Sequence, residues 1–246
     1  MSNRNATIKP AHRLRSRVKP TAALHVRRRF KTTKSAVETN QSLRVFASQH
    51  GKSHLLLIDN PWSMGMSASS PPRLSPEAHY PTMSPAALLD VDLDLICEKD
   101  CVIGFWALNG QTSLAYAILK RYGFTVITSV TWLKLREKGG AAYIPNGGPS
   151  GNISELFLIA KRGRGLPISK TAERFWSVMS LPRTVHSAKP PIFRQMLARL
   201  YPMTREGKRV KRLELFARER TLGWRAWGNQ APDEMGAAPR ALKKAA

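Results

Sequence analysis

A short apolar run that ends in four unusual residues constrains this chain more than any other stretch. Leu55–Ile58 is continuously apolar, and Asp59-Asn60-Pro61-Trp62 follows it directly. Such a run indicates a strand covered on both faces, and a proline cannot continue a central strand. In open α/β sheets, ligands lie just beyond the carboxyl ends of the strands, so we expect Asp59 and an exposed Trp62 at the rim of a pocket. The alternative is a strand followed by an ordinary Asn-Pro turn.

The apolar pattern of the rest of the chain predicts strands that alternate with helices. Runs rich in β-branched and aromatic residues predict strands, and apolar residues at helical spacing predict helices. Ser84 followed by Pro85 is a typical helix start, and Gly123 is placed to end a helix. The predicted strands cover 43–47, 55–58, 102–106, 124–133, 155–160 and 213–217, and the predicted helices cover 85–92, 114–122 and 191–201. This alternation predicts an α/β fold with a mainly parallel sheet.

The charge of the chain indicates its partner. The 246 residues carry a formal net charge of +24, and the pI is about 11.0. A field of this strength attracts polyanions by counterion release, so nucleic acid is the expected partner. Packing on RNA of the ribosomal kind would produce the same charge and remains an alternative. No run approaches the ~20 apolar residues of a membrane helix, so we expect no membrane partner.

Charge and apolar content divide the chain into three parts. Residues 1–43 are basic and poor in apolar residues, which predicts a disordered tail that is either a nonspecific nucleic-acid arm or merely solvated. Residues 44–230 are predicted to form the folded domain, and residues 231–246 a flexible tail. Cys97 and Cys101 lack the further ligands of a zinc site, which favours reduced, packed thiols in a cytosolic protein.

Several stretches, taken in order, resemble one family. Asp59-Asn60-Pro61-Trp62 resembles the Asp-Pro-Pro-Trp motif of amino-methyltransferases. The others resemble those of the MT-A type adenine-specific methyltransferases, which include the catalytic subunit of the mRNA adenosine methyltransferase and bacterial and phage DNA adenine methyltransferases. These stretches are His79–Ser84, Gly104–Trp106, Thr131–Lys134, Glu155–Leu158, Arg183 with Ser187–Pro190, Leu213–Arg218 and Gly223–Gln230.

The resemblance implies a fold, a cofactor and a set of site residues. It implies a Rossmann-like sheet that binds S-adenosylmethionine, with a circularly permuted order in which the catalytic strand comes first. The implied catalytic residues are Asp59, Asn60, Pro61 and Trp62. The implied cofactor-binding residues are Asp59, Lys189 (to the methionine carboxylate), Glu214, Phe216, Arg218, Asn229 and Gln230. The implied substrate-binding residues are Tyr80, Trp132, Lys134 and Glu155, and no metal is implied.

The chemistry of an adenine amine fits these roles. Its lone pair is delocalised into the ring, so acceptors on its N–H groups favour a more nucleophilic nitrogen. The Asp59 carboxylate and the Asn60 carbonyl are the expected acceptors, and Trp62 is expected to stack on the base. Because the methyl donor is already activated, catalysis consists mainly of positioning and charge placement. Asn60 departs from the proline of the family motif, although it keeps the backbone carbonyl.

Three functions remain open from the sequence. The first is methylation of the 6-amino group of adenine in DNA, by a cytoplasmic enzyme of bacterial or phage type that associates with the nucleoid while it acts. The second is the same reaction on RNA. The third is a noncatalytic nucleic-acid-binding protein with a vestigial pocket, which the substitution at Asn60 would favour. A base inside duplex DNA would have to be flipped out of the stack.

Overall fold

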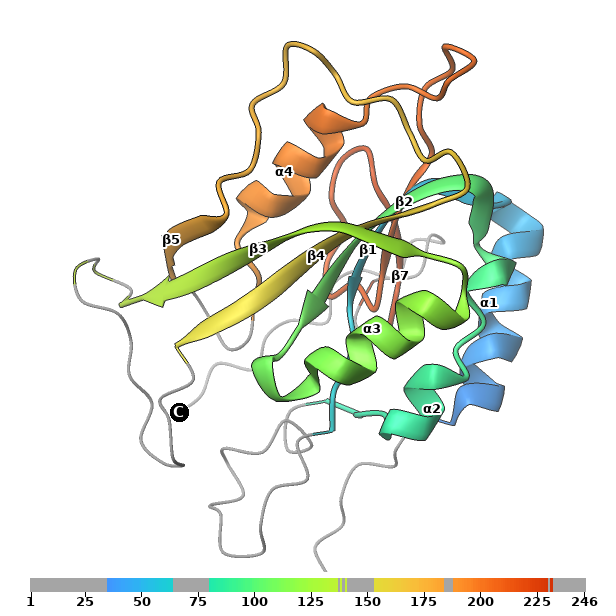
Figure 1. The fold of residues 1–246 in the computed structure, drawn as a ribbon. Coiled ribbons are helices and arrows are strands. Elements are labelled where there is room, and N and C mark those ends of the chain that lie inside the picture. The colour runs from blue at the N-terminus through green and yellow to red at the C-terminus, as the bar shows by residue number, and fades with distance from the viewer. Residues whose placement is uncertain are drawn as a thin grey trace, which may run out of the picture. The chain divides into compact units, whose positions relative to one another are not determined.

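A single seven-stranded sheet organises the computed structural model, and β1 (Ser53–Asp59) lies inside it (Figure 1). The structure describes residues 35–63, 80–136, 138, 140, 153–183, 188–229 and 231. The strand order is β5-β3-β4-β2-β1-β6-β7. Among these strands only β4 runs antiparallel to its neighbours, β2 and β3. The prediction of a mainly parallel α/β sheet is therefore confirmed.

The elements follow the predicted alternation, with some additions. The other strands are β2 (Cys97–Ala107), β3 (Thr125–Leu135), β4 (Ser154–Arg162), β5 (Val178–Pro182), β6 (Arg212–Leu215) and β7 (Arg225–Trp227). The helices are α1 (Ala36–His50), α2 (Pro85–Leu89), η3 (Leu93–Leu95), η4 (Asn109–Gln111), α3 (Thr112–Arg121) and α4 (Pro191–Leu200). The short strands β5 and β7 were not predicted. Each pairs with a longer strand, and this pairing stabilises sequences that carry little strand signal of their own.

Local signals account for the helix ends. The Ser84 hydroxyl accepts a hydrogen bond from the Ala87 N–H, and Pro85 occupies the first turn of α2, as predicted. After α3, Gly123 takes a left-handed φ of 71°, a conformation that glycine adopts without a steric penalty.

The predicted strand at 43–47 is wrong, because these residues lie in α1. Ser35 caps this helix, and its hydroxyl and the Glu38 carboxylate form a reciprocal capping box. Leu43 and Phe46 are three residues apart on one face of the helix and are both buried. The boundary predicted at residue 43 therefore falls inside a helix, and the folded domain begins by Ser35. Of the predicted tails at 1–43 and 231–246, residues 1–34 and 232–246 lie outside the described part.

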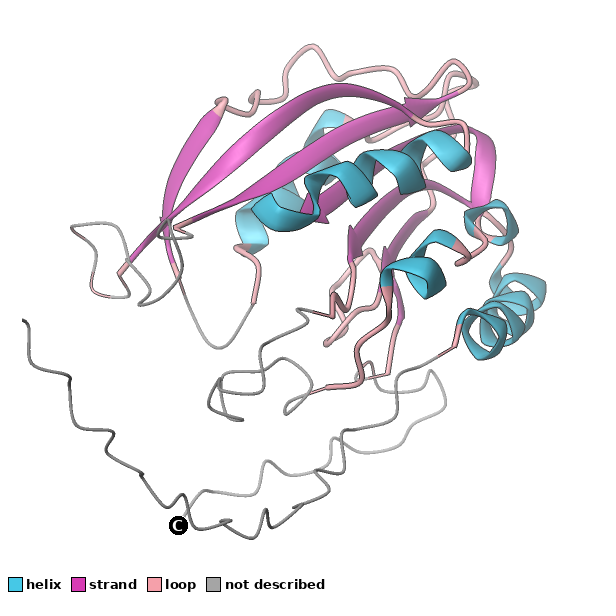
Figure 2. Ribbon diagram, turned by 60° about the horizontal axis from the view of Figure 1, so that its bottom comes forward, coloured by secondary structure: helices cyan, strands magenta, loops and turns pink. Residues whose placement is uncertain are grey.

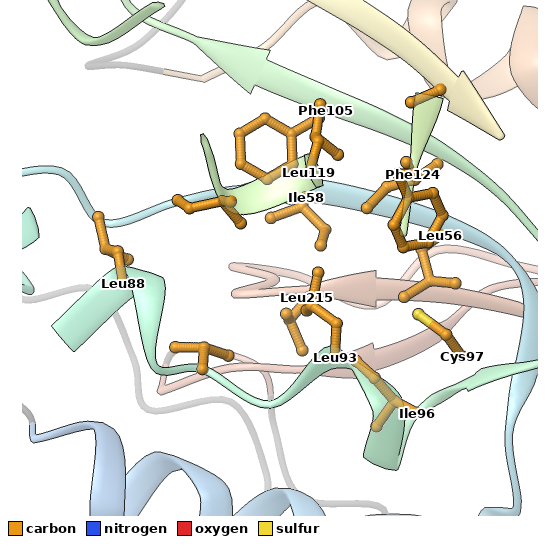
Figure 3. Close-up of a cluster of buried hydrophobic side chains, with 14 of the residues drawn as sticks. Leu56, Ile58, Leu88, Leu93, Ile96, Cys97, Phe105, Leu119, Phe124 and Leu215 are labelled. Atoms are coloured by element: carbon orange, nitrogen blue, oxygen red, sulfur yellow. The ribbon is translucent and has the colours of Figure 1, made fainter. Parts of the chain in front are cut away.

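Apolar side chains cover both faces of the sheet. Leu56 and Ile58 point into a cluster with α1, α2 and α3 (Figure 3), whereas Leu55 and Leu57 point into a cluster with α4 on the opposite face. Figure 2 shows helices on both sides of the strands. This alternation fixes the register of β1, because a slip of one residue would exchange the two faces. Cys97 and Cys101 are free and buried in the first cluster, as expected.

Candidate active site at the carboxyl end of the sheet

The parallel strands β1, β6 and β7 end at the same edge of the sheet. Asp59 is the last residue of β1, and Ile58 pairs with Leu215, the last residue of β6. Phe216, Ala217 and Arg218 follow β6 directly, and Asn229 follows β7 after one glycine. This register brings residues more than 150 positions apart in the sequence to one site.

Two cavities lie at this edge, and they share a wall made by Asp59, Phe216 and Arg218. The smaller encloses about 50 Å³ and the larger about 220 Å³. The smaller is also lined by Asn60, Pro61, Tyr80, Pro81, Ala217 and Asn229. The larger is also lined by Leu57, Trp106, Ala188, Lys189, Pro190, Pro191, Phe193, Arg194, Glu214 and Glu219. Most of the residues that the sequence analysis proposed are thus brought together.

A chain of alternating charges runs along the carboxyl edge of the sheet, from Asp59 at the end of β1 to Lys134 near the end of β3. The Lys189 Nζ lies 2.9 and 3.0 Å from the two Asp59 carboxylate oxygens and 3.2 Å from Glu155 Oε2. The other oxygen of Glu155 lies 2.6 Å from Lys134 Nζ. Lys189 also lies over the ring of Trp106, 5.6 Å from its centroid, which adds a cation–π attraction. Three strands (β1, β3 and β4) and the segment just before α4 supply the four charges, and their sum is zero.

Burial and this pairing determine the protonation of the network. Burial raises the pKa of Asp59, and the charge of Glu155 adds to this effect, while Lys189 and Arg218 oppose it. Burial also disfavours ionisation of Glu155, but the two lysines outweigh it and leave the pKa of Glu155 below its ordinary value. Asp59 and Glu155 overcome the effect of burial on Lys189 and raise its pKa. Lys189 therefore stays a cation, whereas the pKa of Asp59 lies above the ordinary value of an aspartate.

Glu214 is held in the larger cavity by a residue that the sequence analysis missed. Arg194 donates to Glu214 Oε2 at 2.6 Å and also lies 3.4 Å from Glu219 Oε1. Burial raises the pKa of Glu214, although Arg194 opposes this. The sequence near Arg194 shows only an amphipathic helix after two prolines, so no local signal marks it as a site residue.

The turn after β6 is strained at the shared wall. Phe216 has a φ of 60°, a left-handed conformation that is rare for an aromatic residue, and its ring packs against Trp227. Gly228 permits this turn, because a Cβ there would lie 2.4 Å from the Ala217 carbonyl oxygen. Strain of this kind is common at ligand sites. Beside it, the Arg218 guanidinium lies over the ring of Tyr80, 5.0 Å from its centroid.

The two predicted site tryptophans are buried, which corrects the expected exposure of Trp62. Trp62 is 5% exposed and packs edge-on against Phe105, so it presents no open face to a ligand. Trp132 is 2% exposed, donates to the Leu181 carbonyl and packs against Trp106. Neither lines the two cavities described above. The sequence could not show this, because a tryptophan after a strand has the same signature in a rim as in a core.

The remaining predicted residues differ in where they lie. Lys134 and Glu155 line neither of the two cavities, although both were predicted to contact substrate. Glu155 pairs with Lys189, and Lys134 pairs with Glu155. Gln230 lies outside the described residues. Asn60 lines the smaller cavity, and its carbonyl accepts from the Trp62 N–H at 2.9 Å, which leaves one lone pair. Its buried side-chain Nδ2 has no hydrogen-bond partner among the residues that the structure describes.

The arrangement suits a zwitterionic amino-acid group such as the methionine end of S-adenosylmethionine. Asp59 and Lys189 present opposite charges within 3.0 Å of each other, and Phe216 and Trp106 add apolar surface nearby. A metal site has no such support, since no group of three potential ligands occurs in the described residues.

Comparison with known proteins agrees with this geometry. The MT-A70 family model matches residues 53–230, which begin at β1 and end just beyond β7. The chain belongs to the MT-A70 family. Methyltransferases of this family use S-adenosylmethionine as the methyl donor. The sheet is therefore the Rossmann-like sheet that was expected, with the strand that carries Asp59 first.

Three curated relatives illustrate the family. The chain is 25% identical over 155 residues to the type II methyltransferase M.MunI of a Mycoplasma species, a match that covers 63% of this chain and 60% of that protein. It is 25% identical over 186 residues to the mouse N(6)-adenine-specific methyltransferase METTL4, covering 71% and 36%. It is 29% identical over 150 residues to the N6-methyladenosine RNA methyltransferase MTA1 of Pyricularia oryzae, covering 58% and 38%. The matches thus span between about a third and three fifths of these relatives.

In the described part, no helix has the length and apolarity needed to cross a bilayer.

Proposed function

We propose that this protein transfers a methyl group from S-adenosylmethionine to the 6-amino group of adenine in DNA. The observation that carries the proposal is the position of Asp59. Its carboxylate ends an interior strand, lies in the wall shared by both cavities and is held by Lys189. One carboxylate can therefore contact both the cofactor and the base that receives the methyl group.

The cofactor is proposed to span both cavities. Lys189 would bind its carboxylate and Asp59 its ammonium group, next to Glu214 and Phe216 in the larger cavity. Arg218 and Asn229, with Gln230, would hydrogen-bond its ribose and adenine across the shared wall. When bound, S-adenosylmethionine supplies a methyl group that its sulfonium already activates.

The target amine is proposed to enter from the side of Asn60, Pro61 and Tyr80. Asp59 and the Asn60 carbonyl would accept its two N–H groups, which localises the nitrogen lone pair. The carbonyl can do this because only one of its lone pairs is engaged by Trp62. Buried Trp62 would then fix the Asn60–Pro61 turn through its packing. Tyr80 and Phe216 are aromatic residues that line the cavity itself.

Charge supports a polynucleotide substrate, and the names of the relatives support adenine as the base. RNA is a second candidate, because one relative that is 29% identical is named an RNA methyltransferase. The family resemblance spans both polymers, and we place DNA first because the family includes bacterial and phage DNA adenine methyltransferases. The net charge of +24 serves either polymer.

Transfer of a labelled methyl group tests the proposal. Purified protein is incubated with labelled S-adenosylmethionine and with DNA and RNA of the same base sequence, in single-stranded and duplex form. We expect label in the N6 position of adenine in DNA, identified after digestion to nucleosides. If RNA is labelled as strongly as DNA or more strongly, DNA would no longer be the preferred substrate. Polymer binding without labelling of any adenine would leave the noncatalytic function.

A further inference from the structure

Basic residues gather at the edge of the sheet opposite the proposed active site. Lys52 immediately precedes β1 and Lys211 immediately precedes β6, so both lie at the amino ends of parallel strands. The two strand starts are joined, because the Leu55 N–H donates to the Lys211 carbonyl at 3.1 Å. Lys211 Nζ lies 3.9 Å from where a Cβ on Gly51 would be. The seven residues of β1 span roughly 20 Å at about 3.3 Å per residue, which separates this edge from Asp59.

A tight turn before β6 adds two further cations. Thr204 and Lys208 exchange hydrogen bonds, and Met203 bridges to Arg209, so residues 203–209 form an ordered turn. Gly207 has a φ of 74° in this turn, which suits glycine. Lys208 and Arg209 are exposed on it, as are Lys52 and Lys211 nearby. We call Lys52, Lys208, Arg209, Lys211 and Arg212 the basic edge.

The acidic residues close to this edge do not neutralise it. Asp94 pairs with Arg162, and both Asp100 and Glu206 pair with Arg164. Within the described residues, none of the five side chains of the basic edge forms an ion pair with a carboxylate. Burial lowers the pKa of Arg212, and the nearby charge of Arg209 adds a smaller effect in the same direction. Arg212 is half-buried and donates to the Ala198 carbonyl, whereas the other four side chains of the basic edge are exposed. Among the described residues, this surface therefore carries positive charge that no carboxylate pairs with.

We propose that the basic edge binds the phosphodiester backbone of duplex DNA on the side of the domain away from the methylated adenine. Exposed lysine and arginine side chains on ordered elements are suited to phosphate contacts, which position a protein on DNA without reading its sequence. The inference rests on the proposed function for the identity of the polymer. About six base pairs, at 3.4 Å each, cover the roughly 20 Å between the two edges, so flanking duplex is long enough to reach both.

The test compares two triple variants of the full chain. Lys52→Gln/Lys208→Gln/Lys211→Gln removes three charges, and the matched control Lys52→Arg/Lys208→Arg/Lys211→Arg keeps them. The readout is the dependence of the affinity for a ~30-base-pair duplex on salt concentration. Each lost phosphate contact reduces the slope of log K against log salt by about 0.9, so the glutamine variant is expected to lose up to ~2.7 of slope and about tenfold or more in affinity at 0.1 M salt.

Cofactor affinity and turnover separate this effect from damage to the site. With saturating DNA, the glutamine variant should keep the kcat and the S-adenosylmethionine affinity of the wild type. An unchanged salt slope, a cofactor affinity that falls as far as the DNA affinity, or an equal loss in the arginine control would overturn the inference. DNA binding is measured without turnover, so the basic edge is tested even if no adenine is methylated. If methylation occurs and the slope is unchanged, only the basic edge fails.

Discussion

Two groups of charged residues at opposite ends of the sheet use similar ion pairs in different surroundings. At the carboxyl end, Lys189 and Glu155 have side chains that are 12% and 5% exposed, and they link Asp59 to Lys134. At the amino end, Arg164 is 65% exposed and pairs with Asp100 and with Glu206. Both groups contain contacts near 2.8 Å, so geometry alone does not distinguish them.

The difference is what happens when one partner is removed. Water solvates a charge left behind at the surface, and exposed pairs therefore contribute little to stability. A charge left behind in the interior keeps the cost of its desolvation, which makes loss of one buried partner expensive. The buried group can consequently fix the orientation of the Asp59 carboxylate and influence its pKa. An exposed group of the same composition would not do this.

Replacing Asp59 should give the largest effect on function. Asp59→Ala removes the proposed acceptor of the amine, and we expect kcat to fall by on the order of 10²–10³-fold or more, comparable to the loss of an electrostatic stabiliser in other enzymes. Methyl transfer from labelled cofactor measures it. Glu219→Ala is the matched control, because this carboxylate lines the larger cavity but is 71% exposed. Full activity in Asp59→Ala would reject the site.

Replacing Glu155 should give the largest effect on stability. Glu155→Ala leaves Lys134 and Lys189 without their common partner, which should lower the free energy of unfolding by about 3–5 kcal/mol. Denaturant unfolding of both proteins measures the difference. Because the pKa of Glu155 is lowered in the folded state, its contribution is present above the ordinary glutamate pKa and is lost as the pH falls through the folded value. The gap between the two proteins should therefore shrink in acid, and a constant gap would contradict the role.

The pH dependence of methylation should show the coupling between Glu155 and Asp59. Asp59 accepts hydrogen bonds only as a carboxylate, so activity should fall as the pH drops through its pKa, which burial raises above the ordinary value of about 3.9. Glu155→Gln removes a negative charge that contributes to this shift. We expect the acid limb of kcat to move to lower pH in this variant, measured where circular dichroism shows a folded protein. A limb that moves upward would break the assignment.

The exposed group should give the smallest effect. Arg164→Gln ends the side-chain contacts to Asp100 and Glu206 at the surface, where solvent replaces them, and the backbone N–H of residue 164 can still donate to Asp100. Its unfolding curve should overlap that of the wild type, and added salt should leave the two indistinguishable. A loss as large as that of Glu155→Ala would show that burial does not separate the two groups.

Elements with a complete local signal could be predicted from the sequence. The apolar run of β1 and the serine-proline start of α2 are where they were expected. For α1, the short apolar segment at 43–47 is ambiguous by itself, because it has the length of a strand. The capping box of Ser35 and Glu38, which begins eight residues earlier, is the local signal that marks this segment as part of a helix.

The contacts of the site were less predictable than its members. Resemblance placed Asp59, Lys189 and Glu155 in one site, but only the fold shows that one lysine bridges both carboxylates. The burial of Trp62 and the presence of Arg194 depend on packing between distant elements. Neither has a signal in the neighbouring sequence, since local pattern does not encode which side chain from another element fills a given space.

The shared wall of the two cavities has a thermodynamic consequence. Asp59, Phe216 and Arg218 face both spaces, and Asp59 is proposed to contact both the cofactor and the target amine. Binding of the donor should then change the affinity for the acceptor, and linkage requires the change to be the same in both directions. Donor and acceptor should accordingly bind as a coupled pair, and removal of the methyl group from the donor should alter how tightly the nucleic acid is held.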